Sequence, residues 1–139
     1  MRSRWPMTGR LDPVLFDELL RCRPWIEAAL EHADGTHNWD DIVAGVYAGH
    51  FHFWPREKSA AITEINVYPR RRIFNVFLAG GDLADLQRFA VEVEESARKA
   101  GCDAVQCSGR AGWARALAGW AGKTPIYRRA VTEKGICDE

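Results

Sequence analysis

The chain has 139 residues, the length of one ordinary domain and too short for separate cofactor and substrate modules. Hydrophobic residues make up 47% of the sequence, which is enough for a packed core and excludes disorder as the main state. The 19 Lys and Arg residues balance the 19 Asp and Glu residues, so the basic surplus typical of nucleic-acid binding is missing. We therefore expect a single domain over residues 1–139 that does not bind nucleic acid.

The cysteine pattern and the hydropathy bear on where the protein works. The four cysteines form no CxxC pair, and a domain of this length does not need disulfides, so reduced thiols are expected. No run approaches the roughly 20 apolar residues of a membrane span, and the first ten residues lack the apolar stretch of a signal peptide. These features favour a cytoplasmic or particle-packaged protein that does not enter a membrane.

Helical periodicity dominates residues 12–48. Asp12 before Pro13 is typical of a helix start, and Pro24 divides the following apolar stripe into a helical pair or a kinked helix that ends before Gly35. Asn38 with Asp41 three residues later predicts a capping arrangement for another helix, which runs to Gly49.

From residue 50 the hydrophobic period changes to two, which predicts strands. A first strand covers residues 50–54 and stops at Pro55, and a second covers residues 60–68. Residues 72–79 are apolar on both faces except at Asn75, a pattern typical of a central strand.

Gly80 and Gly81 end that strand, and Asp82 is the expected cap of the clearest helix in the chain, which Gly101 ends. A short strand over residues 104–108, a helix over about 111–120 and a last strand over 126–133 complete the expected order. The apolar stripe of the long helix is spaced three and four apart, at Leu83, Leu86, Ala90, Val93, Ala97 and Ala100.

From about residue 36 to residue 133 this order of elements resembles the GNAT superfamily of acetyl-CoA-dependent N-acetyltransferases. The run AITEI…FNVFLAGGDL…GCDAVQCSGR…GWARAL is similar to small GNAT-like proteins of tailed phages and prophages, some of which are virion proteins. The resemblance implies a single α/β domain with a mixed central sheet of about five to six strands and helices on both faces. Residues 1–10 do not have the pattern of the family's first strand and are expected to form an N-terminal arm. Other phage or virion proteins would be its partners.

The resemblance also implies acetyl-CoA as the cofactor, held by the backbone amides of Ala79, Gly80, Gly81, Asp82 and Leu83. The family pattern is Gln or Arg, two residues, Gly, any residue, then Gly or Ala. With Gly80 as the glycine this chain has Phe77 and Asp82 at the outer positions, and with Gly81 it has Leu78 and Leu83. The carboxylate of Asp82 would repel a diphosphate at this position. Two like unit charges ~4 Å apart in an effective dielectric of about 20 repel each other by ~4 kcal/mol. Binding of acetyl-CoA is therefore expected to be weak or absent.

Two residues are candidates for catalysis. Glu64 could act as a general base on an amine, and the alternative is a carboxylate paired with one of Arg70 to Arg72. Tyr127 could donate a proton to the leaving thiolate, because the segment 111–120, where the family often carries a Tyr, has none. The alternative for Tyr127 is a packing residue with a solvated hydroxyl.

Three further features are open to more than one interpretation. His50 and His52 could begin a metal site, but no third ligand is evident, so two neutral histidines on an exposed strand face are preferred and no metal is expected. The triplet Arg70–Arg72 after Pro69 could clamp an acidic partner or a phosphate, or only solubilise a hairpin. Trp5 beside Pro6 could anchor a partner.

Two classes of function therefore stay open. One is an active acetyl-CoA-dependent N-acetyltransferase, which the resemblance favours. The other is a GNAT-like scaffold for binding or virion assembly with a degenerate acetyl-CoA site, which the departures at Phe77 and Asp82 favour.

Overall fold

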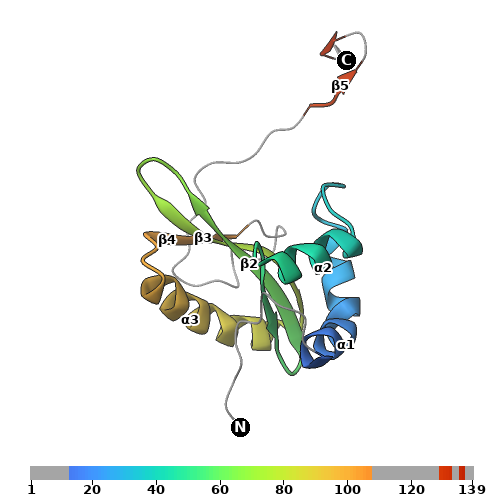
Figure 1. The fold of residues 1–139 in the computed structure, drawn as a ribbon, viewed down its shortest axis with the longest axis vertical. Helices are drawn as coiled ribbons and strands as arrows, with labels where there is room; N and C mark the ends of the chain where they lie inside the picture. Colours follow the sequence, from blue (N-terminus) through green and yellow to red (C-terminus); the bar gives the residue numbers. More distant parts are fainter. Residues whose placement is uncertain (1–12, 108–128, 133–134, 137–139) are drawn as a thin grey trace.

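The computed structural model describes residues 13–107, 129–132 and 135–136. Its main sheet contains β1 (His52–Pro55), β2 (Ser59–Val67), β3 (Arg72–Gly81) and β4 (Ala104–Cys107), hydrogen-bonded in that order. In Figure 1, helices α1 (Pro13–Leu30) and α2 (Trp39–Ala48) lie on one side of the sheet and α3 (Leu83–Lys99) lies on the other. β5 (Val131–Thr132) pairs with β6 (Gly135–Ile136) in a separate two-stranded sheet.

The main sheet is mixed. β1, β2 and β3 pair antiparallel, whereas β4 pairs parallel with β3 after the crossover through α3. The expected α/β domain with a mixed sheet and helices on both faces is confirmed, as is the interior position of β3. The sheet has four strands among the described residues, fewer than the five to six expected.

Alternation along β2 and β3 divides the core into two clusters, one on each face of the sheet. On the α1 and α2 side, Ile62 and Leu78 pack with the buried face of α1, and on the α3 side, Ala61 and Phe74 pack with Phe89 and other residues of α3. Cys102 and Cys107 pack at the border of the second cluster, and the described cysteines (Cys22, Cys102 and Cys107) are free. No helix in the described ranges is long and apolar enough to cross a bilayer.

α1 is a single helix that continues through Pro24, so of the two alternatives the helical pair is wrong and one helix spans the proline. A proline inside a helix costs about 3 kcal/mol. Leu19 before the proline and Ile26 after it are both fully buried against the same core. Because burial of each such side chain stabilises the fold by about 1.5–3 kcal/mol, it offsets the cost of the proline. The helix ends at Leu30, and a turn with left-handed Asp34 and Gly35 follows.

The other helix boundaries agree with the sequence. Asn38 accepts a hydrogen bond from the Asp41 amide (2.9 Å) and Asp41 accepts one from the Asn38 amide (3.0 Å), which is the expected capping box. Gly49 ends α2 in the left-handed conformation, with a φ of 84°. Asp82 caps α3 as expected.

The buried face of α3 differs from the predicted stripe. Asp85, Phe89, Val93 and Ala97 are buried, whereas Leu83 is 49% exposed. The apolar pattern did not predict that Asp85, the first residue of this face, is buried, because its side chain is a carboxylate.

Several sequence predictions fall outside the described residues. They are the helix start at Asp12, the arm at 1–10 with Trp5, the helix at 111–120 and the candidate proton donor Tyr127. The last strand was expected over 126–133. Of its described residues, 129–132, only Val131–Thr132 form a strand, which pairs with β6 and not with the main sheet.

Candidate functional site

A β-bulge in β3 separates two parts of the strand. Ile62 of β2 pairs with Leu78 and Thr63 pairs with Val76, so Phe77 has no partner in the register. Pairing with β4 ends at the same place, because Val76 is the last β3 residue paired within the described ranges. Residues 78–81 therefore pair with β2 along one edge, and no described strand lies along the other.

Close packing accounts for both glycines at the end of β3. A Cβ on Gly80 would lie 2.4 Å from the carbonyl oxygen of Trp25 in α1. A Cβ on Gly81, which has a φ of 121°, would lie 2.5 Å from Cα of Ser59. These positions need glycine whether or not a ligand approaches them.

The start of α3 is already occupied by groups of the chain itself. The Asp82 amide donates to the carbonyl oxygen of Lys58 (2.9 Å), and the Asp82 carboxylate accepts from the Asp85 amide (3.0 Å). Among the hydrogen bonds of the described residues, none uses the amides of Leu83 or Ala84, the other donors of the first turn. The Asp82 carboxylate itself is exposed.

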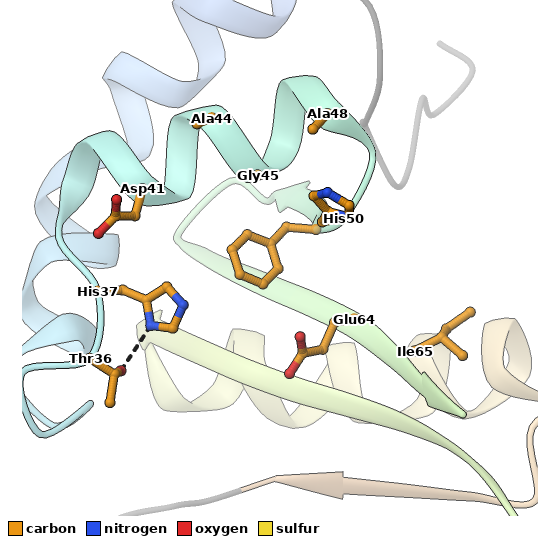
Figure 2. Close-up of a pocket in the computed structure, with 10 residues that line it drawn as sticks. Thr36, His37, Asp41, Ala44, Gly45, Ala48, His50, Glu64 and Ile65 are labelled. Carbon is orange, nitrogen blue, oxygen red and sulfur yellow. Dashed lines mark hydrogen bonds between the residues drawn. The ribbon is translucent and has the colours of Figure 1, made fainter. Parts of the chain in front are cut away.

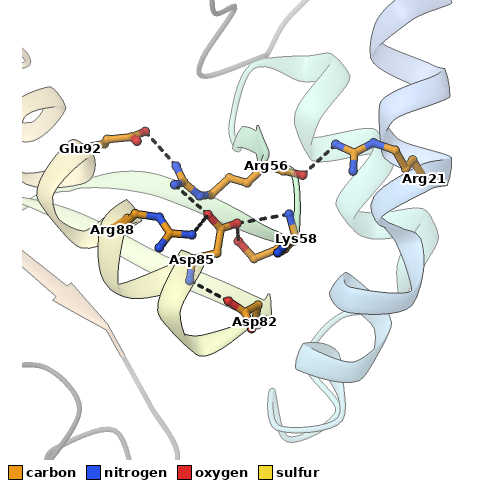
Figure 3. Close-up of polar contacts among 8 residues, drawn as sticks. Arg21, Arg56, Lys58, Asp82, Asp85, Arg88 and Glu92 are labelled. Atoms are coloured by element: carbon orange, nitrogen blue, oxygen red, sulfur yellow. Dashed lines mark hydrogen bonds and ion pairs between the residues drawn. The ribbon is translucent and has the colours of Figure 1, made fainter.

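A buried ion-pair network joins α3 to the β1–β2 connection, as Figure 3 shows. Asp85 accepts hydrogen bonds from the Ser59 hydroxyl (2.7 Å), the Lys58 amide (3.3 Å) and the Arg56 guanidinium (3.2 Å). Arg56 also donates to Glu92 (2.8 Å), and its carbonyl oxygen accepts from Arg21 of α1 (2.9 Å). The network fixes the start of α3 against the sheet.

Electrostatics support Asp85 as an ionised group. Burial alone would raise the pKa of this carboxyl, but the hydrogen bonds from Ser59 and Arg56 and the Arg56 charge outweigh burial and hold the pKa below its usual value. No sequence pattern indicated this network, because its members come from three separated segments.

An open pocket of about 790 Å³ lies between α2, the segment before it and β2 (Figure 2). Glu64 lies in this pocket and accepts a hydrogen bond from the Asn75 amide group on the neighbouring strand (2.8 Å). The His37 side chain faces the same pocket. Its Nδ1 forms a hydrogen bond with the Thr36 hydroxyl (2.8 Å), and its ring packs edge-on against Phe77. The full lining is Thr36, His37, Asp41, Ala44, Gly45, Ala48, His50, Phe51, Glu64 and Ile65.

The predicted site residues fall into separate places. Glu64 lies in the pocket, whereas Ala79 to Leu83 lie at the far end of β3 and the start of α3. Asn75, the register partner of Glu64, is four residues from Ala79, about 13 Å along a strand. The alternative pairing of Glu64 with Arg70–Arg72 is wrong, because the bond that the structure gives Glu64 runs to Asn75 and these arginines make no ion pair with it.

The expected common face of His50 and His52 is also wrong. β1 begins only at His52, whose ring stacks on Phe74 on the α3 side, while His50 precedes the strand and lines the pocket. Burial lowers the pKa of His52. Within the described part of the chain, no three His, Cys, Asp or Glu side chains are grouped as metal ligands would be.

The sequence matches no protein-family model and no curated protein sequence. The fold, however, is similar to solved structures. A probable acetyltransferase superposes with a TM-score of 0.62 at 8% identity, over 90% of this chain and 95% of that chain. An aminoglycoside acetyltransferase, meta-AAC0020 from an uncultured soil metagenomic sample, gives a TM-score of 0.58 at 11% identity, over 88% and 91%. TTHA1254 from Thermus thermophilus gives 0.53 at 19% identity, over 80% and 97%. The chain therefore has a GNAT-like fold.

Proposed function

We propose that the protein is a GNAT-like binding protein of phage or prophage type, with a degenerate acetyl-CoA site, acting as a binding or virion-assembly component. The observation that carries this proposal is the double use of Asp82, whose amide is bound by Lys58 and whose carboxylate takes the Asp85 amide. A fold alone does not define a chemistry, so the residues at the site decide.

A helix start binds an anion through free first-turn amides and the positive end of the helix dipole. At the start of α3 only the Leu83 and Ala84 amides remain, and the exposed Asp82 carboxylate lies beside them. That carboxylate both competes for the positive end of the dipole and repels a second anion. The residues present therefore do not fit the diphosphate of acetyl-CoA.

The assignment to phages or prophages rests on the resemblance of segments such as AITEI and FNVFLAGGDL to small GNAT-like phage proteins. It implies other phage or virion proteins as partners and a location in the bacterial cytoplasm or in the virion. The balanced charge of the chain supports a partner other than nucleic acid.

An active acetyl-CoA-dependent N-acetyltransferase is the second candidate, and two observations favour it. The described pairing of β4 with β3 ends at Val76, so one edge of residues 77–81 has no described strand, and Glu64 is held by Asn75 in an open pocket. In that enzyme Glu64 would deprotonate the amine and Tyr127 would protonate the leaving thiolate.

Calorimetry with acetyl-CoA separates the two candidates. We expect no binding to the natural chain at millimolar ligand. Asp82→Asn keeps a good helix cap but removes the charge, and we expect it to bind acetyl-CoA, with a dissociation constant at least about tenfold below the lower limit that the titration sets for the natural chain. Asp40→Asn, which removes an exposed acid from the first turn of α2, is the matched control and should change nothing. Micromolar binding by the natural chain, with thiol release on adding amines, would overturn the proposal in favour of the enzyme.

A further inference from the structure

The turn between β2 and β3 forms an exposed arginine tip, defined here as residues 67–72. Figure 1 shows this hairpin extending beyond α3 and β4. All six residues are exposed, and Val67 and Tyr68 are 68% and 51% exposed although both are large and apolar. None of the six residues lines the pocket or belongs to the start of α3.

Among the residues that the structure describes, no ion pair involves the arginines of the tip, in contrast to the other arginines of residues 13–107. Arg70, Arg71 and Arg72 form no ion pair with the described residues. The remaining arginines of residues 13–107 each lie within 4 Å of a carboxylate oxygen, and they are Arg21, Arg23, Arg56, Arg88 and Arg98. In a chain with zero net charge, three uncompensated guanidinium groups at one turn form a local positive surface.

The backbone of the tip is already ordered for contact. Pro69 restricts the turn, and the Tyr68 amide donates to the carbonyl oxygen of Arg71 (2.8 Å). At the base, the Arg72 amide donates to the Asp103 carboxylate (2.8 Å) and the Asp103 amide donates to the Arg72 carbonyl oxygen (2.7 Å). Because the turn is fixed before binding, little backbone entropy is lost when a partner docks.

We infer that the arginine tip is a docking surface for an acidic protein partner, an inference that rests on the binding role proposed above. Arginine and tyrosine are the residues enriched where proteins meet, and charge complementarity favours carboxylates on the partner. Solubilising the hairpin would not require exposed Val67 and Tyr68 beside the charges. A nucleic acid is disfavoured, because one short turn offers no basic stripe along which a phosphate backbone could run.

Binding to an acidic copolymer of glutamate and tyrosine tests this inference, measured by fluorescence anisotropy without coenzyme. The natural chain should bind it, and Arg70→Gln/Arg71→Gln should weaken binding by about tenfold or more. Tyr68→Ser should weaken it by a smaller factor. Arg23→Gln/Arg88→Gln removes the same charge from α1 and α3 and is the matched control, which should bind as the natural chain does. Circular dichroism verifies that each variant is folded.

Three results would overturn the inference: no binding by the natural chain, an equal loss in the control variant, or tighter binding to polyuridylate or phosphatidylserine vesicles than to the copolymer. None of them bears on the coenzyme site, since acetyl-CoA is absent from the assay. Conversely, acetyl-CoA binding by the natural chain would refute the degenerate site and leave the arginine tip untouched.

Discussion

Asp85 is the charge that holds the start of α3 to the β1–β2 connection. It is buried at 5% exposure, and its partners Arg56 and Ser59 are buried with it. Removing one partner of a buried ion pair leaves the other charge without compensation, which is more costly than losing an exposed pair. The stability of this junction therefore depends on one carboxylate.

Asp85→Asn should lower the free energy of unfolding by roughly 2–3 kcal/mol. This loss is smaller than the cost of leaving a buried charge with no partner at all, because Glu92 still neutralises Arg56. Glu92→Gln is the matched control. Its carboxylate is 46% exposed, so we expect a loss of about 1 kcal/mol or less. Urea denaturation at neutral pH measures both, and equal losses would contradict the role given to Asp85.

The same carboxylate predicts a pH dependence. The pKa of Asp85 is lower in the folded chain than the ordinary value near 3.9 of an unfolded chain, so the folded state binds fewer protons. Its contribution is therefore present above about pH 4 and is lost as the pH falls through the folded pKa. The stability difference between the natural chain and Asp85→Asn should shrink in urea denaturation at about pH 3. A difference that is unchanged or larger in acid would contradict this sign.

At the scale of the element, the end of β3 is shaped by its contact with α1. Ala in place of Gly80 would put a methyl group against the Trp25 carbonyl oxygen, and overpacking of this kind costs about 1–3 kcal/mol. Gly49→Ala is the control, because Gly49 has a left-handed φ of 84° but open space around its Cα, so only the strain of about 1 kcal/mol applies. Thermal unfolding compares them. A Gly80→Ala chain as stable as the natural one would show that α1 does not require this glycine.

Elements governed by local interactions could be predicted from the sequence. The Asn38–Asp41 box and the cap at Asp82 depend on residues close together in the chain. The central position of β3 depends on distant strands, but it could be predicted because the strand is apolar on both faces. At Pro24 the sequence left a helical pair and a single kinked helix open, because the burial that sustains one helix through the proline is a tertiary effect. The bulge at Phe77 left no periodic signal, since both its neighbours are apolar.

At the scale of the whole molecule, the GNAT-like fold followed from the order of strands and helices, and the solved structures bear it out at identities of 8–19%. The sequence did not predict that Glu64 lies in a pocket, and it did not predict the Arg56–Asp85 network. Both join segments far apart in the sequence, α2 with β2 and the β1–β2 connection with α3. Site chemistry of this kind requires the folded chain.

In the function that we propose, no coenzyme diphosphate binds at the start of α3. The most direct measurement is an amide NMR titration of the natural chain with acetyl-CoA, in which the Leu83 and Ala84 signals are followed. Our account predicts that both signals stay in place up to millimolar ligand. Saturable shifts of these two amides would contradict it.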